Sequence, residues 1–127
     1  MILATQIVAA VAAVLHIVFF VFESVLWTRP AVYARFGIES AEAAETIRPM
    51  AYNQGFYNLA LAVGALVGIV LIGAGHTVVG LTLVIFAMAC MAFAGLILVS
   101  GGAKYLRPAS LQFIPAALAL VLAIVSL

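Results

Sequence analysis

The stretch that decides the fold is residues 2–27, ILATQIVAAVAAVLHIVFFVFESVLW, in which Glu23 is the one charged side chain. A transmembrane helix needs about 20 mostly apolar residues, so this stretch is long enough to cross a bilayer. A charged side chain in the middle of a membrane helix costs about 2.5–3.5 kcal/mol on insertion scales. Such a group usually faces a bundle interior or a wet cavity and has a partner there. We therefore expect a membrane protein with a polar interior.

The composition of the whole chain agrees with this expectation. Of its 127 residues, 69% are hydrophobic and 7% are charged, whereas soluble domains are about 45–50% apolar and about 25% charged. A soluble fold is therefore excluded. The net charge of +1 provides no basic surface, so no nucleic acid partner is expected. The single cysteine, Cys90, cannot form a disulfide within the chain.

Four apolar segments predict an all-α integral membrane four-helix bundle, in one domain over residues 1–127. Pro30 biases the residue before it away from helix and so ends the first segment. Pro49 suits the first turn of the second, and Pro115 should kink the fourth. The expected spans are about 2–27, 49–72, 77–99 and 108–127.

The one substantial hydrophilic segment is residues 28–48. Residues 40–47 are typical of a short surface helix, with Ser40 as its N-cap and acidic side chains in its first turns. We expect this helix to lie at the membrane surface, in the first loop.

The basic residues predict the orientation. All five lie in two loops, with Arg29, Arg35 and Arg48 in the first and Lys104 and Arg107 in the third. Cytoplasmic loops carry an excess of Lys and Arg, so both loops are expected to be cytoplasmic. Both termini would then face outward, in the inner (plasma) membrane of a bacterium.

With this orientation, polar residues on three spans have one depth in the cytoplasmic leaflet. If they converge, each amide can be satisfied by another, as a hydrocarbon environment requires. The sequence therefore predicts a polar pocket centred on Glu23. Its other members at this depth are Asn53, Gln54, Tyr57, Asn58 and Gln112.

The helical spacing supports this pocket on the first two spans. On the first span, intervals of four, three and four residues separate His16, Phe20, Glu23 and Trp27. These intervals place the four side chains on one face of a helix. His16 should be about 10 Å deeper than Glu23 at 1.5 Å rise per residue. On the second span the polar residues cover an arc of about 140° at 100° per residue.

Several of these residues also have a plain structural explanation. Asn58 could form a hydrogen bond between helices. Asn53 and Gln54 could instead contact lipid headgroups. Tyr57 and Trp27 are typical of the aromatic belt at a membrane interface. His16 could be a neutral core histidine, and Gln112 could cap a helix. On the second span, Gly64 and Gly68 are four residues apart, a spacing that suits close helix packing.

The pattern resembles one known family. His16 to Glu23, then Trp27-Thr28, a hydrophilic loop, and the string Asn53-Gln54-Gly55-x-Tyr57-Asn58 are similar to a bacterial group of small four-span membrane proteins, catalogued as domain of unknown function 1304. Gly95 and the Gln112-x-x-Pro115 step extend the likeness over nearly the whole chain. The resemblance implies four helices and the layer formed by Glu23, Asn53, Gln54 and Asn58. It implies no activity, substrate or cofactor.

The first functional hypothesis is a pocket that binds or isomerises a small or lipid-like molecule. Glu23 and His16 would exchange protons with it, as the catalytic pair. No cofactor is expected, and no metal, since zinc sites generally need three or four protein ligands. The side chains expected to orient the molecule are Asn53, Gln54, Tyr57, Asn58, Gln112 and Trp27.

Two other hypotheses stay open. A membrane carboxyl is also typical of a proton relay, so the chain could be a small proton-coupled transporter acting as a homodimer. Alternatively, it is a structural or assembly protein whose polar layer fixes helix pairing. Besides membrane lipid, no partner can be named from the sequence.

Overall fold

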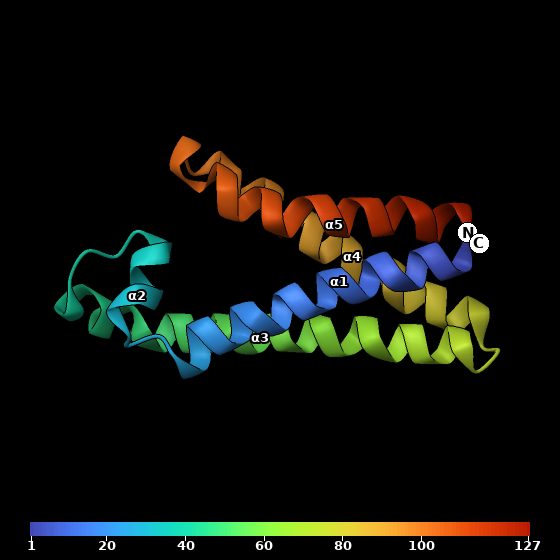
Figure 1. The fold of residues 1–127 in the computed structure, drawn as a ribbon, viewed down its shortest axis with the longest axis horizontal. Coiled ribbons are helices and arrows are strands. Elements are labelled where there is room, and N and C mark those ends of the chain that lie inside the picture. The colour runs from blue at the N-terminus through green and yellow to red at the C-terminus, as the bar shows by residue number, and fades with distance from the viewer. The chain divides into compact units, whose positions relative to one another are not determined.

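The computed structural model describes residues 1–127, and it is built from helices without strands. Four helices are long and apolar enough to cross a membrane, which confirms the predicted all-α class with four spans (Figure 1). They are α1 (Ile2–Phe20, continued by a π-helical turn, Val21–Val25), α3 (Ala41–Gly73), α4 (Thr77–Ser100) and α5 (Leu106–Val125).

The chain divides into two compact units. The first, here called the bundle unit, consists of Met1–Leu15 and Leu61–Leu127. It therefore holds most of α1, the last part of α3 (residues 61–73), and all of α4 and α5. The second, here called the hairpin unit, is His16–Ala60. It holds the end of α1, the loop after it and the first part of α3.

In the bundle unit, each helix touches the next, and the fourth returns to the first. The Gln6 side-chain amide of α1 donates to the carbonyl of Ile69 in α3 at 3.2 Å. The hydroxyls of Thr5 in α1 and Ser126, directly after α5, lie 3.2 Å apart, so the two chain ends are neighbours (Figure 1). Glycines complete the ring, because α3 meets α4 at Gly68 and α4 meets α5 at Gly95.

Many of the buried side chains in the bundle unit are small, although Leu81, Met88 and Met91 of α4 are buried as well, and many large ones face outward. Phe86 and Phe93 of α4 are 66% and 65% exposed. Lipid tails are as apolar as leucine, so burying large apolar side chains stabilises a membrane bundle little. Close contact between small residues stabilises it instead. The buried residues include Ala9, Ala12, Ala13, Ala62, Ala65, Ala116, Ala119 and Ala123.

In the bundle unit, α3 and α4 come into close contact at Gly68 and Gly80. A β-carbon added at Gly80 would lie 2.5 Å from the carbonyl oxygen of Gly68, and one at Gly68 would lie 2.8 Å from that of Gly80. Gly64, the other glycine of the predicted packing step, has no neighbouring atom within 4 Å of such a β-carbon. The glycine step therefore contributes one close contact, through Gly68.

The turn between α3 and α4 is formed by a left-handed glycine, Gly75. Gly75 has a φ of 88°. Its N–H donates to the carbonyl of Ile72 at 3.1 Å, and the N–H of His76 donates to that of Leu71 at 2.9 Å. These two bonds form a Schellman motif, which satisfies carbonyls at a helix C-terminus.

In the hairpin unit, a short helix α2 (Pro30–Tyr33) and a 3-10 turn (Ala34–Phe36) lie between α1 and α3. The indole N–H of Trp27 donates to the carbonyl of Ala44 at 2.8 Å. Trp27 forms a buried cluster with Tyr33, Ala44 and Ala51, against which Phe36, Ile38 and Ile47 pack. This cluster joins the loop to the start of α3.

The structure differs from the sequence-based prediction at the start of the second span. Instead of a separate surface helix and a span beginning at Pro49, one helix runs from Ala41 to Gly73 with Pro49 inside it. Ser40 is the predicted cap, because its hydroxyl accepts from the N–H of Ala43 at 3.1 Å. Pro49 removes one helical hydrogen bond, but Ala44 and Ala51 on either side are buried in the Trp27 cluster. Packing on both sides therefore lets the helix continue.

The contact between Gly68 and Gly80 predicts a contrast between two alanine substitutions. Gly80→Ala should lower the free energy of unfolding by about 1–3 kcal/mol, the usual cost of overfilling a packed site. Gly64→Ala is the matched control, and it should leave stability unchanged or raise it, because its β-carbon meets open space. Thermal unfolding in a mild detergent measures both. Equal stability of the two variants would contradict this packing.

Candidate functional site

The site begins with a change in helix type at the end of α1. After Phe20 the backbone forms the π-helical turn Val21–Val25, in which the N–H of Leu26 donates to the carbonyl of Val21 at 2.8 Å. Such single turns are rare and are frequent at functional sites. Glu23 lies in the middle of this turn. The spacing of residues 16–27 predicted a regular helix through Trp27 and not this turn.

Glu23 is bonded to one of the predicted amides. The side-chain N–H of Asn58 donates to Oε2 of Glu23 at 2.7 Å, within the usual range of N–H···O hydrogen bonds. Asn58 is buried, at 5% exposure, whereas Glu23 is half-buried. The structure therefore brings together the carboxyl and one amide from the first two predicted spans.

Ser24, the residue after Glu23, contacts α3 and holds it close to the π-helical turn. The hydroxyl of Ser24 donates to the carbonyl of Tyr52 at 2.8 Å. Gly55 is buried beside it, and a β-carbon on Gly55 would collide with the Ser24 hydroxyl. This close approach requires glycine, which gives Gly55 of the Asn53–Asn58 string a physical role. No role for Ser24 or Gly55 was predicted from the sequence.

Aromatic rings lie on the same stretch of the two helices. The rings of Phe20 and Phe56 meet edge to face with centroids 5.1 Å apart, and Tyr52 lies 5.0 Å from Phe56. Phe20 is one turn before Glu23, and Phe56 is two residues before Asn58. Phe20 and Phe56 thus form an aromatic contact between the two helices within a few residues of Glu23 and Asn58 along the sequence.

Three predicted residues of α3 are exposed in the chain. Asn53, Gln54 and Tyr57 lie on the outside, and Tyr57 is 62% exposed. A row of small residues on α3 explains why. The residues of this row follow one another at intervals of four, three, four and three along α3, and all of them are buried. They are Ala51, Gly55, Asn58, Ala62 and Ala65. This row could have separated Asn58 from the other three, whose role in binding stays a prediction.

The remaining predicted residues have different settings. Trp27 is buried, and its N–H is already bonded to Ala44. His16 is fully buried, with its ring 5.3 Å from that of Phe19. It precedes Glu23 by seven residues on the same helix. Gln112 is half-buried in α5, in the bundle unit. The parts of His16 and Gln112 in a common pocket stay predictions.

No group of three His, Cys, Asp or Glu side chains lies close enough to hold a metal ion. Among the predicted site residues, a hydrogen bond joins Glu23 and Asn58.

Comparison with known proteins agrees with the resemblance. The family model described as "Protein of unknown function (DUF1304)" matches residues 10–124, which include all of the site. No curated protein and no solved structure matches the chain.

The contact between Gly55 and Ser24 predicts non-additive effects of two substitutions. Gly55→Ala should destabilise the protein by about 1–3 kcal/mol, because the new methyl group overlaps the Ser24 hydroxyl. Adding Ser24→Ala removes that hydroxyl and should recover part of the loss, since residues in contact couple. Unfolding of the two single variants and the double variant in detergent measures the coupling. Simple additivity would contradict the contact.

Proposed function

As the chain belongs to the DUF1304 family of proteins of unknown function, and as it pairs Glu23 with Asn58, we propose that it binds a small or lipid-like molecule. The binding site is a polar pocket in the cytoplasmic leaflet of the bacterial inner membrane, with both chain ends facing outward. The observation that carries this proposal is the 2.7 Å hydrogen bond between the Asn58 amide and Glu23 Oε2.

Helix pairing alone does not explain a carboxyl at this place. A charged group in a membrane span costs about 2.5–3.5 kcal/mol, and one hydrogen bond to a charged group contributes about 1.5–3 kcal/mol. The two figures nearly cancel. A neutral amide pair would join the same helices without the cost of a carboxyl, so the carboxyl supports a role in binding.

The surroundings indicate the kind of molecule. Glu23 is half-buried rather than enclosed, so a bound group can reach its carboxyl. Phe20 and Phe56 provide an apolar wall on both helices. A ligand with a hydrogen-bonding head and an apolar body fits this combination, as a quinone or a lipid-derived molecule would.

The pair of titratable groups on α1 supports a chemical role in the same pocket. His16 is buried two turns before Glu23. A carboxyl and an imidazole that exchange protons with one substrate can act as acid and base in an isomerisation. In this proposal Asn58 orients the Glu23 carboxyl.

The same two residues favour a second candidate function, a proton-coupled transporter. Intramembrane chains of Glu and His are typical of proton relays, and His16 and Glu23 lie on one helix. Four helices form a thin wall for alternating access, so this function needs a homodimer. A protein that stays monomeric in lipid would contradict it.

Replacing the carboxyl by an amide separates binding from structure. In Glu23→Gln the Asn58 amide can still donate to the side-chain oxygen, so the free energy of unfolding should change by no more than about 1 kcal/mol. Small molecules that co-purify with the gently solubilised wild type should be lost, and mass spectrometry detects them. Glu39→Gln, at an exposed acid in the loop, is the matched control and should retain them.

Two outcomes of this experiment would contradict the proposal. Unchanged co-purifying molecules in Glu23→Gln would show that the carboxyl does not bind them. A large loss of stability without a change in bound molecules would instead indicate a structural or assembly role for the pair.

A further inference from the structure

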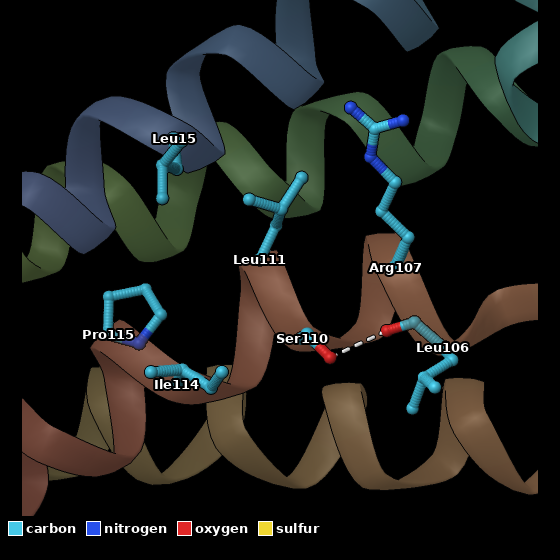
Figure 2. Close-up of a pocket in the computed structure, with 7 residues that line it drawn as sticks. All are labelled: Leu15, Leu106, Arg107, Ser110, Leu111, Ile114 and Pro115. Atoms are coloured by element: carbon cyan, nitrogen blue, oxygen red, sulfur yellow. Dashed lines mark hydrogen bonds between the residues drawn. The ribbon is translucent and has the colours of Figure 1, made fainter.

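A second feature lies in the bundle unit and shares no residue with the Glu23 site. It is a groove of about 520 Å³ between α1 and α5. Figure 2 shows Leu15 of α1 on one side and the side chains of Leu111, Ile114 and Pro115 of α5 along its length. Its volume is in the range of about 300–1,000 Å³ that is usual for small-molecule sites. The walls are apolar apart from one end.

Arg107 lies at that end. Figure 2 shows its side chain and that of Leu111 extending from the same side of α5. The hydroxyl of Ser110, the other polar side chain of the lining, is bonded to the carbonyl of Leu106 at 2.7 Å. The guanidinium group is therefore the polar group of the groove that a ligand can use.

The residues of the groove match the layers of a bilayer. Helix α5 has 20 residues, so it is about 30 Å long and matches the hydrocarbon thickness. Arg107 is its second residue, whereas Leu111, Ile114 and Pro115 come four to eight residues later. They are thus about 6–12 Å further along the helix. A cation at the level of the headgroups and an apolar wall below it match the shape of a phospholipid.

The charged side chains of the bundle unit indicate which kind of lipid headgroup the groove would bind. The chain has four acidic residues, and all of them, Glu23, Glu39, Glu42 and Glu45, are in the hairpin unit. Arg107 is exposed and forms no salt bridge, the one ion pair being that of Arg48 with Glu45. Lys104 lies three residues before Arg107, with its ammonium 5.0 Å from the Tyr105 ring centre. Two cations without an acidic side chain in their unit are complementary to a phosphate, which arginine binds through two parallel hydrogen bonds.

We propose that this groove is a binding site for an anionic phospholipid. The phosphate pairs with Arg107, and one acyl chain lies along Leu111, Ile114 and Pro115. The site holds a lipid whether or not the Glu23 pocket binds its own ligand, because the two share no residue.

The experiment compares two lipids that differ in headgroup charge. The full-length protein is reconstituted with vesicles of equal parts phosphatidylglycerol and phosphatidylcholine with the same acyl chains, and lipid retained after gentle extraction is measured by native mass spectrometry. Wild type should retain phosphatidylglycerol in preference to phosphatidylcholine. Arg107→Gln should lower the retained phosphatidylglycerol about tenfold, the effect of losing one charge-assisted contact. Arg29→Gln, at an exposed arginine of the hairpin unit, is the matched control and should retain it like wild type.

A second variant tests the apolar wall. Leu111→Ala should lower the retention of both lipids without changing the preference between them, because it removes acyl contact and leaves Arg107 in place. Leu111 is exposed, so this change should not disturb folding. Equal retention of the two lipids by wild type, or the same preference in Arg107→Gln as in wild type, would overturn the proposal.

Discussion

The hydrogen bond between the Asn58 amide and the Glu23 carboxyl is the interaction on which the rest of the site depends. It joins α1 to α3 at 2.7 Å, and two local features surround it. The π-helical turn carries Glu23 and Ser24, and one additional residue in a turn rotates the side chains after it by about 100° relative to a regular helix. Gly55 leaves room for Ser24 to reach the Tyr52 carbonyl. The Glu23 carboxyl thus has a partner held in place by its neighbours.

The bundle unit is stabilised by contacts of another kind. Its helices meet through glycine and alanine and through a few polar contacts, such as those of Gln6 with Ile69 and of Thr5 with Ser126. Many large apolar side chains, such as Phe86 and Phe93, face outward, where acyl chains can cover them. This inversion of the soluble pattern results from a solvent that is itself apolar. It explains why close glycine contacts, rather than a large core, position the helices.

The sequence predicts the helices well because each span is a long apolar run, and length decides between a span and a core segment. It also places Asn58 in one group with Glu23, among other polar residues of the same depth, and the structure joins these two by a hydrogen bond. Depth, however, does not tell which side of a helix faces its neighbour, so Asn53, Gln54 and Tyr57 could not be separated from Asn58 by depth alone. The π-helical turn has no known spacing pattern. Pro49 predicts a helix start, whereas the structure continues the helix through it. The packing of the Trp27 cluster on both sides of Pro49 involves residues distant in sequence, so the local sequence does not show it.

The central claim is that the Glu23 carboxyl faces a buried amide rather than the acyl chains. An experimental structure of the protein in lipid nanodiscs, at a resolution that places side chains, tests this most directly. We predict a Glu23 oxygen within about 3.2 Å of the Asn58 side-chain nitrogen, the usual limit for such a bond, with the π-helical turn present. A carboxyl that points into lipid, away from Asn58, would contradict this claim.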